Sequence, residues 1–145
     1  MSSAPFDVQQ VMDRLREQVP ELREINGAAD YRTVSKLSDF YPPCAYVVLT
    51  SEQGDNSEKR GRQRALVTFG VVLAVRNYRD TKGEESMDAL RPLLGKVRDA
   101  LIGWLPSEQG AREIAWKAGD VIDYDHSTLL WGDVYQTQHF IGSGK

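Results

Sequence analysis

The segment that most constrains the fold is residues 65–77, which read ALVTFGVVLAVRN and carry no charge before Arg76. Successive side chains of a strand point to opposite faces of a sheet, and here the two alternating sets differ in size. The bulky set is Val67, Phe69, Val71, Leu73 and Val75, and the small, mixed set is Leu66, Thr68, Gly70, Val72 and Ala74. We therefore predict a central strand whose bulky face packs on helices and whose other face lies close to a second surface.

Two helices are expected, one on each side of this strand in the sequence. Over residues 7–18 apolar side chains recur at helical spacing, and Pro20 ends the run because proline cannot continue the hydrogen-bond ladder. The second helix ends near Leu105. We place Pro92 in its first turn, where proline is tolerated, so that regular helix begins near Leu90.

The remaining apolar segments predict further strands. They lie at residues 44–50, 113–116, 121–124 and 128–141. Residues 21–40 have a weaker pattern that fits a short strand near Ile25 and a short helix within 28–37. Together the elements predict an α+β (mixed α/β) fold, with a largely antiparallel sheet of about four to five strands and helices packed on one face.

Composition fits one domain spanning residues 1–145, with 41% hydrophobic and 27% charged residues. The net charge of −3 argues against a dedicated nucleic-acid-binding protein, which would carry a surplus of Lys and Arg. The single cysteine, Cys44, and the lack of a signal-peptide pattern predict synthesis in a cytoplasm. The longest apolar stretch, residues 71–75, is too short to span a membrane.

Residues 51–64 (SEQGDNSEKRGRQR) contain no large apolar side chain, so we expect a mobile polar loop there and a loose tail at 142–145. The loop begins acidic and ends basic, which would let it fold back as a ribbon. Its charges, together with two aromatic residues on a mixed polar face of the last strand, are candidates for contacts with a neighbouring subunit. These candidates are Glu52, Asp55, Glu58, Lys59, Arg60, Arg62, Arg64, Trp131 and Tyr135.

The densest group of possible metal ligands is Asp120, Asp123, Asp125 and His126. Its geometry is poor, because on a strand Asp123 and Asp125 lie on one face and the other two on the opposite face. Cys44 opens a hydrophobic strand, where a cysteine behaves as a small apolar side chain. No phosphate-binding glycine loop or nucleophile-elbow motif occurs in the sequence. We expect no catalytic residue, metal or cofactor, and keep a small metal-dependent enzyme at Asp123, Asp125 and His126 as the hypothesis of another class.

Several segments together carry a resemblance that spans most of the chain. They are the opening helix, residues 27–30 (GAAD), the proline-led strand at 43–48, the long strand ending at Asn77, residues 90–104 (LRPLLGKVRDALIGW) and the final strand from Leu129. In pattern and order they resemble the tail terminator (tail completion) proteins of long-tailed phages, of the Mu-like and lambda-like kinds.

This resemblance implies a structural virion protein made in the host cytoplasm, with no catalytic residues and no cofactor. Six copies would form a ring that caps the tail tube, ends its polymerisation and provides the surface for joining to the head connector. The implied partners are further copies of the chain, the tail tube protein and a head–tail connector or neck protein. DNA would pass through the lumen without specific binding, and no membrane is involved. The alternatives are another neck or tail component, such as a head–tail adaptor or tail tube subunit, and a regulatory binding module.

Overall fold

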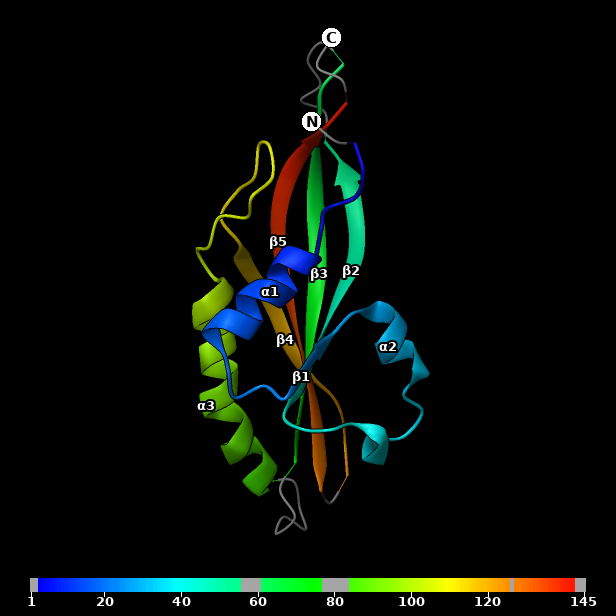
Figure 1. The fold of residues 1–145 in the computed structure, drawn as a ribbon, viewed down its shortest axis with the longest axis vertical. Helices are drawn as coiled ribbons and strands as arrows, with labels where there is room; N and C mark the ends of the chain where they lie inside the picture. Colours follow the sequence, from blue (N-terminus) through cyan, green and yellow to red (C-terminus); the bar gives the residue numbers. More distant parts are fainter. Residues whose placement is uncertain (1–2, 56–60, 77–83, 126, 143–145) are drawn as a thin grey trace.

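The structure is a computed structural model that describes residues 3–55, 61–76, 84–125 and 127–142, with only the backbone of 84–87. A five-stranded sheet has the order β1-β2-β3-β5-β4 (Figure 1). The elements are α1 (Gln9–Gln18), β1 (Glu24–Asn26), α2 (Ala28–Thr33), the 3-10 helix η1 (Leu37–Asp39), β2 (Cys44–Gly54), β3 (Gln63–Arg76), α3 (Glu84–Leu101), β4 (Ala115–Tyr124) and β5 (Thr128–Ile141). Only β1 and β2 pair in parallel, so the predicted α+β class with a largely antiparallel sheet is confirmed.

β3 lies at the centre of the sheet, as predicted. It pairs with β5 without interruption from Gln63 opposite Ile141 to Arg76 opposite Thr128, and with β2 on its other side. Its five bulky side chains are between 0% and 3% exposed and belong to one core with the buried faces of α1 and α3. This buried apolar surface is the main favourable term in the stability of such a domain.

The face of β3 that carries the small side chains is also covered, over part of its length. Val72 and Ala74 form a second apolar cluster with Phe40 and Tyr46, against which Tyr31 of α2 packs. The ring centroids of Tyr31 and Tyr46 lie 5.5 Å apart. α1 and α3 therefore cover one face of the sheet, while α2 and η1 cover part of the other, where small side chains allow a close approach.

The predicted bounds of α3 and β4 are wrong. α3 begins at Glu84 and not near Leu90, ends at Leu101 and not near Leu105, and contains Pro92. The apolar side chains that α3 buries downstream of the proline offset the lost hydrogen bond. β4 is one strand over Ala115–Tyr124, where two short pieces were expected, because main-chain pairing with β5 continues it across a polar stretch without apolar alternation.

The predicted loop at 51–64 is wrong at both ends, because β2 continues to Gly54 and β3 begins at Gln63. Residues 56–60 and 143–145 lie outside the described residues. Of the predicted loose tail, Gly142 donates its backbone N–H to Ser3 Oγ at 2.9 Å, which brings the two ends of the described chain together. None of the helices in the described residues is long and apolar enough to cross a membrane.

Leu73→Ala tests the central role of β3. Leu73 is fully buried, so we expect its truncation to lower the free energy of unfolding by about 2–5 kcal/mol. Leu105→Ala removes the same atoms from a side chain that is 57% exposed, and should change stability by less than about 0.5 kcal/mol. Urea unfolding followed by circular dichroism measures both. Equal effects of the two substitutions would contradict the placement of β3 in the core.

Candidate assembly surface

Asp133 on β5 is the most heavily hydrogen-bonded side chain on the helix-covered face of the sheet. It is 1% exposed and accepts two hydrogen bonds from Arg98 of α3, Nε to Oδ2 and Nη2 to Oδ1, each of 2.9 Å. Trp131 Nε1 donates to Oδ1 at 2.8 Å, and the Tyr135 hydroxyl donates to Oδ2 at 2.9 Å. A buried carboxylate is tolerated when it is paired and fully hydrogen-bonded in this way, and this one links α3 to β5.

The hydrogen bonds of Asp133 with Arg98, Trp131 and Tyr135 form what we call the Asp133 network, and β4 packs over it. The Arg98 guanidinium lies 5.0 Å from the ring centroid of Trp116 on β4 and 5.9 Å from that of Trp131. Gly119 faces the network from β4, and a Cβ there would lie 2.6 Å from Asp133 Oδ1. Glycine is required at this position because any side chain would displace a charged group or an indole ring.

Burial alone would raise the pKa of Asp133, but hydrogen bonds from Arg98, Trp131, Trp116 and Tyr135 outweigh it and hold the pKa below its usual value. Desolvation, reinforced by the charge of Asp133, raises the pKa of Tyr135, so that its phenol remains a hydrogen-bond donor. The network therefore consists of one anion and one cation at neutral pH.

This arrangement corrects the prediction that Tyr135 belongs to an interface. Tyr135 is fully buried and its ring stacks on Phe69, with centroids 5.5 Å apart. Trp131 is partly buried and held by Asp133. The face of β5 has a mixed polar pattern in the sequence because it carries Asp133. In the folded chain that carboxylate is buried and its charge is paired with Arg98.

The outer side of the network is a surface of another kind. β4 is the edge strand of the sheet, and nine of its ten residues are exposed while the other is partly buried. Its exposed large apolar side chains are Trp116 (42%), Val121 (42%), Ile122 (47%) and Tyr124 (59%). Such a cluster on a strand edge marks a contact surface more often than isolated exposed residues do.

At the far end of the sheet, Glu52 fixes the N-terminal segment. Its Oε1 accepts the backbone N–H of Phe6 at 2.7 Å, and its Oε2 lies 2.7 Å from Nε2 of the buried His139. The rings of Phe6 and His139 meet edge to face. Glu52, predicted as an interface charge, is therefore engaged within the chain.

The ribbon formed by the ends of β2 and β3 carries most of the other predicted interface charges. Arg64 pairs with Asp55 across it, with Nη1 and Oδ2 3.4 Å apart, so one pair of opposite charges meets where the segment folds back. Arg62 is exposed and its guanidinium lies 4.7 Å from the ring centroid of Phe140. Glu58, Lys59 and Arg60 lie outside the described residues.

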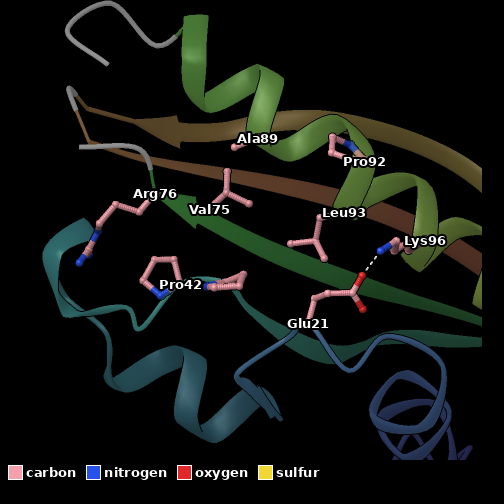
Figure 2. A pocket seen from close by; sticks show the side chains of 9 residues that line it. Glu21, Pro42, Val75, Arg76, Ala89, Pro92, Leu93 and Lys96 are labelled. Carbon is pink, nitrogen blue, oxygen red and sulfur yellow. Dashed lines mark hydrogen bonds and ion pairs between the residues drawn. The ribbon is translucent and has the colours of Figure 1, made fainter. Parts of the chain in front are cut away.

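A groove of about 340 Å³ opens between α3, the end of β3 and the proline-led turn before β2. Figure 2 shows Val75, Leu93 and Pro42 lining it, with the ion pair of Lys96 and Glu21 at one side. Hydrogen bonding to Lys96 lowers the pKa of Glu21. The walls are mainly apolar, and the one carboxylate is already paired, so the groove offers no acid–base pair for catalysis.

Comparison with known proteins decides the family. A family model described as phage tail terminator protein matches residues 1–145. The chain belongs to the phage tail terminator family. The predicted resemblance is thus confirmed, and the family is one of structural tail proteins, not enzymes.

A solved structure titled "Virion of native gene transfer agent (GTA) particle" contains a chain of similar fold. The TM-score is 0.56 at 18% sequence identity, over 88% of this chain and 90% of that one, a likeness that concerns the fold alone. No match was found among curated proteins.

Among the residues predicted as possible metal ligands, Asp125 has a structural role. The Asp125 carboxylate accepts hydrogen bonds from the backbone of Ser127 and Thr128, which forms the turn before β5. His126 lies outside the described residues, and the described ones contain no group of three potential metal ligands. Burial raises the pKa of the Cys44 thiol to about 11, far from that of a nucleophilic thiolate.

Sequence reasoning missed Arg98 and Gly119. A signal for Arg98 existed, because it lies four residues after Leu94 and three before Leu101, on the apolar stripe of its helix. A cation there, and an aspartate on the inward face of the last strand, each require a buried partner of opposite charge. Gly119 gave no signal, because its strand was not predicted as continuous.

Asp133→Asn tests the network. An amide in this position turns a nitrogen donor towards groups that already donate, and it leaves Arg98 without its anion. We expect the free energy of unfolding at pH 7 to fall by about 2–4 kcal/mol in urea titrations. Asp120→Asn, an exposed substitution on β4, should leave it unchanged. Equal stability of the two variants would contradict the role of the network.

The same variant gives a pH signature. Because the pKa of Asp133 is lower in the folded than in the unfolded chain, its carboxylate stabilises the fold above the unfolded pKa of about 3.9. That stability is lost as the pH falls through the folded pKa. Wild-type stability should therefore decline more steeply below about pH 4 than that of Asp133→Asn. Parallel declines would show that Asp133 is not the responsible group.

Proposed function

We propose that this chain assembles with five further copies into a ring on the end of the finished tail tube. The ring ends tube polymerisation and offers the surface on which the head connector or another neck protein docks. The family match over the whole chain carries this proposal. The similar fold of a chain in a gene transfer agent virion supports it.

The rigidity of the sheet supports ring formation. A head-to-tail contact closes into a ring only when each copy is rotated by a fixed fraction of a turn, and otherwise produces a filament. β3 is held along its length by β2 and β5, and the Asp133 network fixes β4 and α3 to the same sheet. A subunit of this kind presents its contact surfaces at constant angles.

The uncharged part of the sheet suits a DNA-conducting lumen. On the face turned away from α1 and α3, beyond the area that α2 covers, lie partly buried side chains without formal charge. They include Thr68 and Gly70 of β3 and Val134, Gln136 and Gln138 of β5. A duplex passing this part of the face would meet no cation before the ribbon, where Arg62 and Arg64 lie on the same side as Phe140. With so few cations to hold its phosphates, DNA would move through without specific binding.

The ribbon tip is the part we assign to contact with the tube or the adjacent subunit. Glu52, Asp55 and Arg64 each have an oppositely charged or hydrogen-bonding partner within the chain, whereas Arg62 is exposed near the tip. Charges at the rim of an interface determine orientation and association rate more than affinity. We expect the ribbon to orient the ring on the tube.

Loss of this protein distinguishes the proposal from its two nearest alternatives. Without a terminator, tubes continue to grow, so we expect headless tails of irregular and excessive length in electron micrographs. Restoring the gene should return them to one length.

The alternatives give other results in the same experiment. Loss of a tail tube subunit would leave no tubes, and loss of a head–tail adaptor would leave tails of normal length separate from heads. Either result would contradict the terminator function.

A further inference from the structure

The exposed apolar side chains of the described chain are concentrated along one edge of the molecule. We call this the edge patch, made of Ile102, Leu105, Trp116, Val121, Ile122 and Tyr124; the one exposed large apolar residue outside it is Tyr41. Backbone hydrogen bonds of 2.9 Å between Gly103 and Ile114 and between Ile114 and Trp104 hold the turn after α3 beside the start of β4. The turn therefore adjoins the end of β4 that carries Trp116, whereas Val121, Ile122 and Tyr124 lie towards the other end, beyond Lys117 and Asp120.

The backbone of β4 is open on the same side. In the described chain β4 pairs with β5 alone, which leaves the outward N–H and C=O groups of its backbone without a strand partner. Register shifts on either side of Ala118–Val121, together with the exposed Lys117, make this edge irregular at two points that a partner strand has to match. An edge shaped in this way accepts one strand in one register and resists indiscriminate aggregation.

The opposite edge of the same sheet is complementary to it. β1 covers only Cys44, Ala45 and Tyr46 of β2, and the described residues provide no main-chain partner on the outer side of Val47–Leu49. Successive strands β2, β3, β5 and β4 alternate in direction, so β4 is antiparallel to β2. A second copy placed beside β4 in the same orientation would present its β2 antiparallel to β4 and continue the sheet.

The available area agrees with such a contact. A ten-residue strand extends about 34 Å, and a strip of that length and about 12 Å width buries about 400 Å² on each partner. With the turn at 102–105 added, the total surface area buried by the two partners approaches the roughly 1,000 Å² that a specific contact needs. Each copy in a ring makes two such contacts.

We propose that the edge patch and the open backbone of β4 form the docking surface for the next copy of this chain. The next copy meets it with the outer edge of its β2, in a head-to-tail contact. This inference rests on the proposed ring and specifies its subunit seam.

Light scattering over a concentration series tests the seam with three variants of the full chain. Tyr124→Lys places a charge in the patch at an exposed position, so we expect it to fold normally and to weaken association about tenfold or more. Tyr124→Phe keeps the apolar ring and should associate like the wild type. Gln9→Lys, which adds the same charge at an exposed position of α1, is the matched control.

A photoreactive phenylalanine derivative at position 124 locates the partner edge. We expect crosslinks to residues 47–49, or to the neighbouring β1, of another copy. A wild type that remains monomeric at every concentration would overturn the proposal, as would undiminished association of Tyr124→Lys or crosslinks to β4 of the second copy. Tail length in the absence of the protein is measured separately, so a monomeric chain that still restores tail length would overturn this seam and leave the proposed function standing.

Discussion

Burial of the bulky face of β3 is the constraint on which the other elements depend. A strand with five fully buried side chains on one face needs a helix layer over it, and α1 and α3 supply that layer. Its position at the centre of the sheet requires a strand on each side, which β2 and β5 provide. The small side chains of its other face determine how closely α2 approaches. One strand thus determines both layers of the domain.

The parts of the fold that sequence predicts are those with a local signal. The alternation in β3 and the helical spacing in α1 each lie within one segment, and both elements were found. β4 lacks such a signal, because Lys117, Gly119 and Asp120 interrupt any apolar alternation, and the strand exists through pairing with β5. The start of α3 was missed for a related reason, since Pro92 suggested a boundary that burial of the downstream side chains overrides.

In the candidate assembly surface, too, contacts between residues close in sequence were predictable and contacts between distant residues were not. Charge pairing between Asp55 and Arg64 was predictable, because a ribbon brings near neighbours in sequence together. The pairing of Arg98 with Asp133 joins residues 35 positions apart, and it depends on how α3 packs on β5. In the sequence, Asp133 has no visible partner and gives its face of β5 the mixed polar character of an interface. The prediction that Tyr135 lies in an interface was wrong for this reason. In the folded chain the exposed large apolar side chains lie one strand further out, on β4.

The proposed function depends on the shape of the subunit and on the surfaces it presents. The internal polar residues are used to fix the sheet, α3 and the N-terminal segment to one another, and the outward features are the edge patch and the ribbon. A subunit that must repeat at a constant angle needs this combination of an internally fixed body and defined edges.

Cryo-electron microscopy of isolated tails tests the terminator account most directly. The account predicts one ring of six copies of this chain at the head-proximal end of every tube, and none along its length. Density for the chain repeated along the tube, or tube ends of normal length without it, would contradict the account.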